Sequence, residues 1–160
     1  MKIGLLSDTH SFFDKKIYNY FKDVDEIWHA GDIGSIKVLE DLIAFKNTKA
    51  VYGNIDDFKI RNYCEKELIF SINNYTIYMT HIGGKPPNYN KEVIHMLKKI
   101  KPDIFICGHS HILKISKDKN LNLLYINPGA AGKVGFQKYR TLVRFEITSN
   151  NVKSMEVIKL

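Results

Sequence analysis

Polar side chains that can bind metal ions follow five short apolar stretches of this chain. In each case they stand within a few residues of the end of the stretch. In open α/β sheets, ligands bind in the crevice beyond the carboxyl ends of the strands. If each stretch is a strand, these side chains gather around one crevice. They are Asp8, His10, Asp32, Asn54, His81, His109 and His111.

The residue types in this set are typical of a site for two metal ions. Carboxylates, imidazoles and an amide oxygen are ligands that suit manganese, iron, nickel or zinc. Seven such ligands are too many for one tetrahedral ion, but they fit two ions that share a bridging carboxylate. Each motif has an ordinary explanation by itself, since Gly31-Asp32 and Gly53-Asn54 are common turn dipeptides. Their joint occurrence at five predicted strand ends favours the metal site.

The other histidines and the cysteines are assigned structural roles. His95 falls within a predicted helix, and we expect it to be structural or solvated. His29 stands three residues before Asp32. We expect a structural role for it, and the alternative is that it supports the metal site. Cys107 ends an apolar stretch and is expected in the core. Two cysteines provide neither a disulfide framework nor a thiolate zinc site, which fits a reducing compartment.

Apolar stretches and helical periodicity alternate along the chain and predict the elements that position these side chains. The front half alternates strands and helices, which implies a parallel sheet with covering helices. The back half is richer in strands and is expected to be more antiparallel. Two sheets flanked by helices satisfy both halves, and one large mixed sheet is the alternative. Helices are predicted over residues 14–21 and after the capping residues Ser35 and Asn90. Strands are predicted over residues 2–6, 25–29, 49–52, 68–72, 76–80, 103–107, 121–126, 141–147 and 152–158.

Length and composition are those of an ordinary globular protein. The chain has 160 residues, of which 44% are hydrophobic and 26% charged, and these values exclude a disordered chain, a collagen and a coiled coil. We expect one domain over residues 1–160. No apolar stretch approaches the roughly 20 residues that span a bilayer, and the first residues lack the pattern of a signal peptide. A cytoplasmic protein that binds no membrane is therefore predicted.

The formal net charge of +7 mildly favours an anionic ligand such as a phosphate ester or a nucleic acid. On charge alone, a solvated basic surface is the favoured explanation. Aromatic and basic residues are not interleaved as in single-strand nucleic-acid binders, so nucleic acid is not the favoured partner. A homo-oligomer is left open.

The order of the motifs resembles the calcineurin-like metallophosphoesterase superfamily. The small size and an Asn-Pro-Gly-Ala segment at residues 127–130 are similar to the short bacterial and archaeal phosphodiesterases of that family. The resemblance implies the α/β fold class, as a four-layer α/β/β/α sandwich of two mixed sheets flanked by helices. The family pattern D-x-H, G-D, G-N, H and G-H-x-H stands here as Asp8/His10, Gly31-Asp32, Gly53-Asn54, His81 and Gly108-His109-Ser110-His111.

The resemblance also implies how the candidate residues share two divalent ions, with manganese expected and zinc, iron or nickel as alternatives. A hydroxide that bridges the ions then attacks phosphorus in line, without a covalent intermediate. Asp32, Asn54 and His81 are the implied catalytic residues, as positioners of metal and phosphate, and no separate general acid is identified. The implied ligands are Asp8, His10, Asp32 and His111 for one ion and Asp32, Asn54, His81 and His109 for the other.

Two departures from the family pattern bear on the substrate. Ile55 stands where many larger members carry a histidine that assists the leaving group, and the segment after His81 lacks a second histidine. Short members without the first histidine are associated with diesters, so a phosphodiesterase is favoured over a phosphomonoesterase. The expected substrate is a small phosphoester or a nucleotide. The alternative on the same fold is a non-catalytic protein-binding scaffold similar to the retromer subunit.

Overall fold

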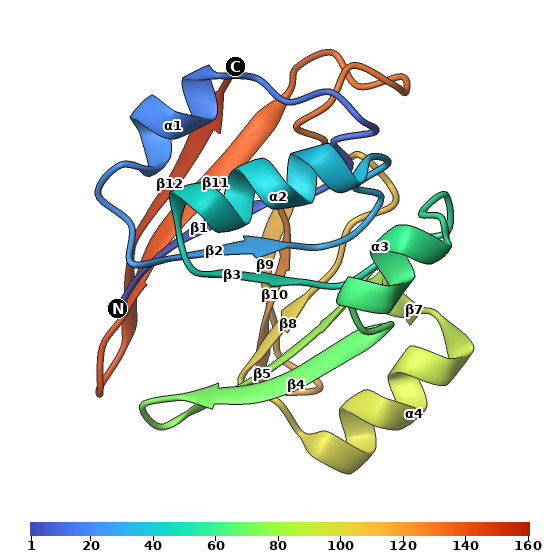
Figure 1. Ribbon diagram of the computed structural model, residues 1–160. Coiled ribbons are helices and arrows are strands. Elements are labelled where there is room, and N and C mark those ends of the chain that lie inside the picture. The colour runs from blue at the N-terminus through green and yellow to red at the C-terminus, as the bar shows by residue number, and fades with distance from the viewer.

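The computed structural model describes residues 1–160, and two five-stranded sheets pack face to face in it (Figure 1). The first sheet has the spatial order β12 (Val152–Lys159), β11 (Thr141–Ile147), β1 (Lys2–Leu6), β2 (Glu26–His29) and β3 (Thr48–Ala50). The strands β1, β2 and β3 run parallel, as the alternation of strands and helices predicts. The C-terminal hairpin adds to β1 in the antiparallel direction.

The second sheet is also mixed. Its spatial order is β4 (Glu67–Ile72), β5 (Tyr75–Thr80), β8 (Ile104–Ile106), β10 (Leu123–Asn127) and β9 (Lys114–Asp118). The three central strands run parallel, while β4 and β9 pair antiparallel at the two edges. A separate short hairpin is formed by β6 (Gly84–Lys85) and β7 (Asn88–Tyr89).

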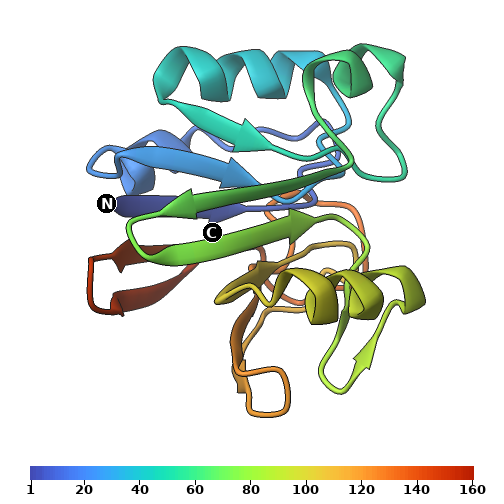
Figure 2. The same cartoon turned by 90° about the horizontal axis from the view of Figure 1, so that it is seen from below.

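Helices cover the outer face of each sheet (Figures 1 and 2). The first sheet is covered by α1 (Lys16–Phe21) and α2 (Ile36–Phe45), and the second by α4 (Lys91–Ile100). The short α3 (Phe58–Tyr63) belongs to the segment that leads from β3 to β4. The predicted four-layer α/β/β/α sandwich of two mixed sheets is confirmed, and the alternative of one large sheet is wrong. None of these helices is both long enough and apolar enough to cross a membrane.

Three apolar cores fill the spaces between the four layers. Both sheets are covered on both faces, so their central strands are apolar at successive positions rather than at alternate ones. On β2, Ile27 packs toward the helices, while Trp28 packs between the sheets. On β8, Phe105 packs under α4. A Cβ on Gly4 would lie 2.8 Å from the ring of Phe21, so the missing side chain allows α1 to approach β1 closely.

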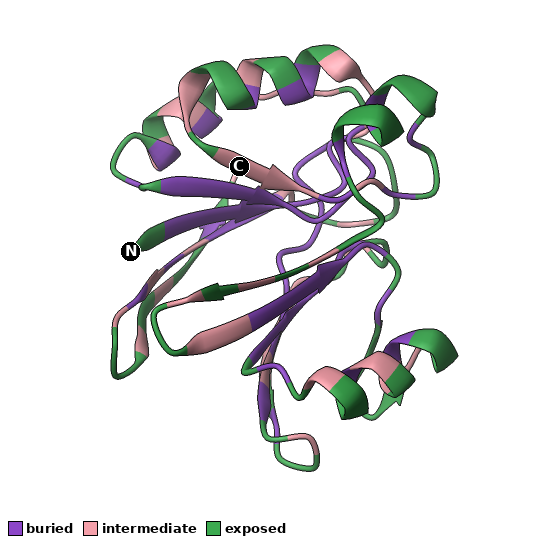
Figure 3. Cartoon of the chain, turned by 60° about the horizontal axis from the view of Figure 1, so that its bottom comes forward, coloured by how far each residue is buried: buried purple, intermediate pink, exposed green.

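Burial continues beyond the strand ends into the loops that follow β1 and β2 (Figure 3). Residues 7–9 and 30–33 are buried although they belong to no strand. Polar groups in buried loops need partners, because an unpaired buried polar group costs free energy. The interactions that these two loops make therefore determine the geometry at this edge of the sandwich.

Most predicted elements appear with small shifts of their ends. The strand over residues 2–6 is observed as predicted, and the strand predicted over residues 49–52 is observed as Thr48–Ala50. The hydroxyl of Ser35 and the side chain of Asn90 cap α2 and α4, as predicted. The sequence analysis did not identify α3, which is capped by Asp57, or the edge strand β9.

Candidate metal centre

The seven candidate ligands lie in loops at the carboxyl ends of strands, on one edge of the sandwich. The loops after β1, β2 and β3 contribute from the first sheet, and the loops after β5 and β8 contribute from the second. Six of the seven residues form two groups whose possible ligand atoms lie within 4.8 Å of one another in each group. Cluster A is Asp8, His10 and His111, and cluster B is Asp32, His81 and His109.

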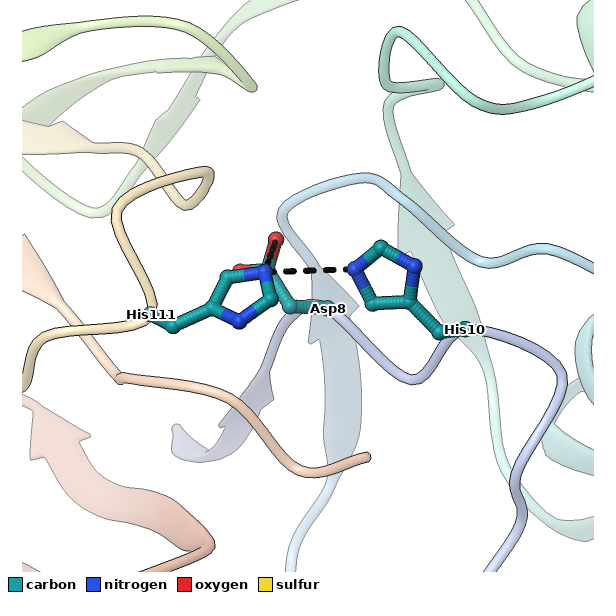
Figure 4. Close-up of side chains that lie close together, drawn as sticks. All are labelled: Asp8, His10 and His111. Carbon is teal, nitrogen blue, oxygen red and sulfur yellow. Dashed lines mark hydrogen bonds and ion pairs between the residues drawn. The ribbon is translucent and has the colours of Figure 1, made fainter. Parts of the chain in front are cut away.

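Cluster A joins residues from both sheets (Figure 4). The Nε2 atom of His111 lies 3.2 Å from Oδ1 of Asp8 and 3.2 Å from Nε2 of His10. The two imidazole nitrogens therefore face the same small space, beside the fully buried carboxylate of Asp8. This arrangement is suited to a cation that all three side chains bind together.

Asp32 lies between the two clusters and directs one oxygen toward each. Its Oδ2 is 3.6 Å from Nε2 of His10, and its Oδ1 is 3.2 Å from Nε2 of His81. Oδ1 of Asp8 is in turn 4.0 Å from Nε2 of His81. The clusters are therefore adjacent, and the carboxylate of Asp32 is in position to be shared.

The His81 ring provides a direct test of whether cluster B fits a metal ion. Its Nδ1 donates a hydrogen bond to the carbonyl oxygen of Ala30 at 2.8 Å, so in the neutral ring the lone pair lies on Nε2. That Nε2 is buried and has no hydrogen-bond partner. A divalent ion would satisfy it, and imidazole nitrogen is a common ligand of such ions. The donor set of cluster B therefore fits a metal ion.

Asn54 is placed beside cluster B by its two neighbours in the chain. The backbone N–H of Ile55 donates to Oδ1 of Asp32 at 3.1 Å. A Cβ on Gly53 would lie only 2.0 Å from the same oxygen, so no other residue fits there without displacement of Asp32. Asn54 and His81 also line one cavity of about 450 Å³. The structure thus brings all seven predicted residues to one region.

Comparison with known proteins identifies the family. A family model described as the calcineurin-like phosphoesterase superfamily domain matches residues 1–150. This chain belongs to that superfamily. A probable metallophosphoesterase of Methanocaldococcus jannaschii is 32% identical over 136 residues, and the match covers 81% of this chain and 68% of the relative. A phosphodiesterase of the same organism is 30% identical over 148 residues, with 81% and 83% of the two chains covered.

Solved structures share the fold. An archaeal phosphodiesterase superposes with a TM-score of 0.78 at 24% identity, with all of both chains covered. Vps29 of Chaetomium thermophilum superposes with a TM-score of 0.78 at 11% identity, with 100% of this chain and 94% of that chain covered. Membership of the superfamily implies divalent metal ions, and clusters A and B are two groups that can bind them.

Five candidate ligands of this calcineurin-like phosphoesterase adopt left-handed backbone conformations. Left-handed residues other than glycine are uncommon, and each costs on the order of 1–3 kcal/mol unless its surroundings compensate. Such residues are common at functional sites, where the surrounding structure holds the backbone in the conformation that positions the functional side chains. The φ angles are 53° for Asp8, 46° for His10, 52° for Asp32, 67° for His109 and 57° for His111.

The charges of the two clusters shift one another's pKa values. Burial alone would raise the pKa of the Asp32 carboxyl, but His81, the Ile55 N–H and His10 together lower it. Burial would lower the pKa of His81, but Asp32 and Asp8 raise it. The Asp8 carboxylate raises the pKa of His111. The carboxyl group of Asp32 is thus held ionised, and a cation is favoured beside it, whether a proton on a histidine or a metal ion.

Asp56 supports the centre and was missed by the sequence analysis. Its Oδ2 accepts hydrogen bonds from the N–H groups of Ile33 at 3.1 Å and Gly53 at 2.7 Å. Its Oδ1 accepts from the N–H of Gly34 at 2.6 Å. One buried carboxylate thereby joins the loop that carries Asp32 to the loop that carries Asn54. The sequence feature that could have identified Asp56 is its place two residues after Asn54, in a Gly-Asn-Ile-Asp segment.

His29 also supports the loops rather than the clusters, which agrees with the role assigned to it. Its Nδ1 accepts from the N–H of Gly31 at 3.2 Å, so its Nε2 carries the hydrogen and donates to Oγ1 of Thr9 at 3.0 Å. The Thr9 hydroxyl donates to the carbonyl of Ile33 at 3.0 Å. This chain of hydrogen bonds ties the Asp8 loop to the Asp32 loop and requires a neutral His29.

We expect His29 to make the metal-free protein less stable in mild acid. Burial lowers its pKa from 6.5 to about 4, so between these values the unfolded chain binds a proton that the folded chain does not. The free energy of unfolding should therefore fall as the pH falls through this window, by up to about 1.4 kcal/mol per pH unit from this residue. Urea denaturation of the wild type and of His29→Gln at several pH values measures the difference. Glutamine keeps a donor and an acceptor but does not titrate, so equal pH dependence of the two proteins would contradict the assignment.

Proposed function

We propose that this protein is a metal-dependent phosphodiesterase that uses two divalent ions. The observation that carries the proposal is the position of Asp32, which directs one carboxylate oxygen toward cluster A and the other toward cluster B. A carboxylate between two groups of ligands is what a pair of ions with a shared ligand requires. The family membership of the chain supports the same activity.

The proposed ligands divide between the two clusters. Manganese is the ion we propose, since the ligands are oxygen and imidazole nitrogen, and zinc, iron and nickel accept the same set. When bound, the two ions supply a hydroxide at neutral pH and positive charge against the phosphoryl oxygens. The ligands are Asp8, His10, Asp32 and His111 for one ion and Asp32, Asn54, His81 and His109 for the other.

The side chains of the protein orient the metal ligands and the phosphate. Hydrogen bonds to the backbone hold His81 and Asp32 in place, so neither has to reorganise as charge develops on the phosphate. Asn54 is exposed and lines the adjoining cavity, where it can position a phosphate oxygen. Ile55 is 45% exposed beside it and has no proton to donate. A diester with a good leaving group needs no such donor, which supports a diester as substrate.

The cavity beside cluster B is where we place the organic group of the ester. Its volume of about 450 Å³ lies in the usual range for small-molecule sites. Its lining combines apolar side chains with cationic and acidic ones, and the cations can pair with the phosphate of an organic ester: Tyr52, Arg61, Lys66, Glu67, Glu92, Val93 and Met96. We propose a small phosphoester or a nucleotide as substrate, and a single cytoplasmic domain over residues 1–160.

A protein-binding scaffold is the second candidate function. Large apolar side chains are exposed beside the candidate centre, among them Phe58 at 69% and Ile112 at 65%, and Phe136 is fully exposed. Exposed apolar patches mark interaction surfaces in many proteins. Vps29 of Chaetomium thermophilum shares this fold. The complete set of candidate ligands favours the phosphodiesterase over the scaffold.

Metal restoration tests the proposal directly. Protein stripped of metal should hydrolyse neither bis(p-nitrophenyl) phosphate nor p-nitrophenyl phosphate, and added manganese should restore hydrolysis with the diester preferred. The release of p-nitrophenol measures both reactions side by side. A preference for the monoester would contradict the diesterase assignment. Absence of turnover with manganese, nickel, zinc and iron would favour the scaffold.

Metal counting tests the shared position of Asp32. Asp32→Asn should lower the affinity for both ions and abolish turnover, whereas His81→Ala should weaken one ion only. Loss of a ligand should lower the metal affinity by more than the about 10–100-fold that is typical when a residue hydrogen-bonded to a ligand is removed. Inductively coupled plasma mass spectrometry after dialysis gives the number of ions per chain. His95 is exposed on α4, so His95→Ala is the matched control and should retain both ions. Two tightly held ions in His81→Ala would overturn the assignment of cluster B.

A substitution at Ile55 tests what determines the substrate class. Ile55→His places a proton donor beside Asn54, so hydrolysis of an alkyl phosphomonoester such as glycerol 2-phosphate, whose leaving oxygen needs a proton, should rise relative to the diester, by about 100-fold for a well-positioned acid. Ile55→Ala removes the same side chain without adding a donor and should leave the ratio unchanged. The ratio of kcat/KM for the two substrates is the measurement. An unchanged ratio in Ile55→His would remove the missing donor as the explanation of specificity.

A further inference from the structure

The loop between β10 and β11 contacts the back of the His111 ring. Within it, Oε1 of Gln137 lies 3.1 Å from Nδ1 of His111. Nε2 of the same amide donates to the carbonyl oxygens of Gly132 at 3.2 Å and Val134 at 2.8 Å. Two of the three polar contacts of the Gln137 side chain are thus made to carbonyl oxygens, which can only accept.

These contacts determine which ring nitrogen of His111 carries a hydrogen. The carbonyls of Gly132 and Val134 only accept hydrogen bonds, so the NH₂ group of Gln137 must face them and its Oε1 must face His111. Oε1 also only accepts, so Nδ1 of His111 must carry the hydrogen. In the neutral ring the lone pair then lies on Nε2, the atom that faces Asp8 and His10.

We propose that Gln137 is a positioning residue, which fixes the tautomer and the direction of the His111 ring so that Nε2 is available to a metal ion. The metal part of this inference rests on the proposed function. Histidine ligands of metals generally donate their other N–H to an acceptor that fixes the ring in this way. For His81 that acceptor is the backbone oxygen of Ala30, whereas for His111 it is a side chain. The His111 acceptor can therefore be removed by substitution.

The loop is built to bring Gln137 against the ring. Gly135 has a φ of 115°, and a Cβ there would lie 2.2 Å from Nδ1 of His111 and 2.3 Å from Oε1 of Gln137. No side chain fits at this position while the hydrogen bond is made. The end of the loop is fixed by Arg140, which donates to Oδ2 of Asp14 at 2.8 Å and lies over the ring of Phe12.

Lys133, four residues before Gln137 in the same loop, also lies over the Phe12 ring, with its Nζ 4.2 Å from the ring centroid. Phe12 stands two residues after His10, so these contacts attach the loop to the segment that carries His10. The same loop holds His111 through Gln137. The loop and the two histidines therefore form one connected unit, and the position of Gln137 relative to His111 is determined from both ends.

The test compares Gln137→Leu with Gln137→Glu. Leucine removes the acceptor, so manganese affinity at one of the two sites should fall about 10–100-fold by isothermal titration calorimetry without substrate. Glutamate keeps an oxygen that can accept from Nδ1 but loses the donor to the carbonyls of Gly132 and Val134, so it should lose less affinity than leucine. Phe136→Ala is the matched control in the same loop, because the Phe136 side chain is fully exposed. It should leave both sites unchanged.

A second measurement reads the tautomer without any metal. In metal-free protein at alkaline pH, two-dimensional ¹⁵N–¹H correlation spectra of the histidine rings should show His111 with the hydrogen on Nδ1. Gln137→Leu should shift the ring toward the other tautomer or a mixture, while thermal unfolding confirms that the variant is folded. This result holds or fails independently of phosphodiesterase activity. An unchanged tautomer in Gln137→Leu, or unchanged manganese affinity at both sites, would overturn the proposal.

Discussion

Two carboxylates are buried at the point where the two sheets meet, and the arrangement around them follows from the need to compensate their charge. Asp8 is fully buried and Asp32 is 2% exposed. An ionised carboxylate removed from water costs several kcal/mol unless it is paired. His111 stands 3.2 Å from Asp8 and His81 stands 3.2 Å from Asp32. Divalent ions would compensate the charge more completely, because Nε2 of His81, which faces Asp32 without forming a hydrogen bond, could also bind them.

The loops can hold these groups close together because their backbone is fixed from outside the clusters. Left-handed residues such as Asp8 and Asp32 persist only where the surroundings compensate their cost. Asp56 accepts three backbone N–H groups from two loops, and His29 links the Asp8 loop to the Asp32 loop. Neither residue belongs to cluster A or cluster B. Both act by making the strained conformations the favoured ones.

The sequence predicts much of this structure, since the predictive features are local. An apolar stretch followed by Asp-x-His or Gly-His-x-His specifies both a strand and the residues at its end. The pattern alone left two sheets or one large sheet open, and the four-layer fold was implied by the family resemblance. The roles of Asp56 and Gln137 could not be predicted in the same way. Each depends on hydrogen bonds to backbone groups of loops whose conformation is set by tertiary packing. The six-residue α3 is too short for helical periodicity, and the edge strand β9 carries lysines where a buried strand would be apolar.

The clusters join distant parts of the chain, and this has a consequence for folding kinetics. His10 and His111 are 101 residues apart in sequence, and they meet only when the two sheets dock. We expect the centre to be completed late in folding, because contacts between such distant residues require the chain to lose much entropy first. An ion held there acts as a removable cross-link between the sheets. Interactions formed after the transition state slow unfolding and leave the folding rate unchanged. Bound ions would thus lengthen the lifetime of the native protein, and their removal would shorten it without hindering refolding.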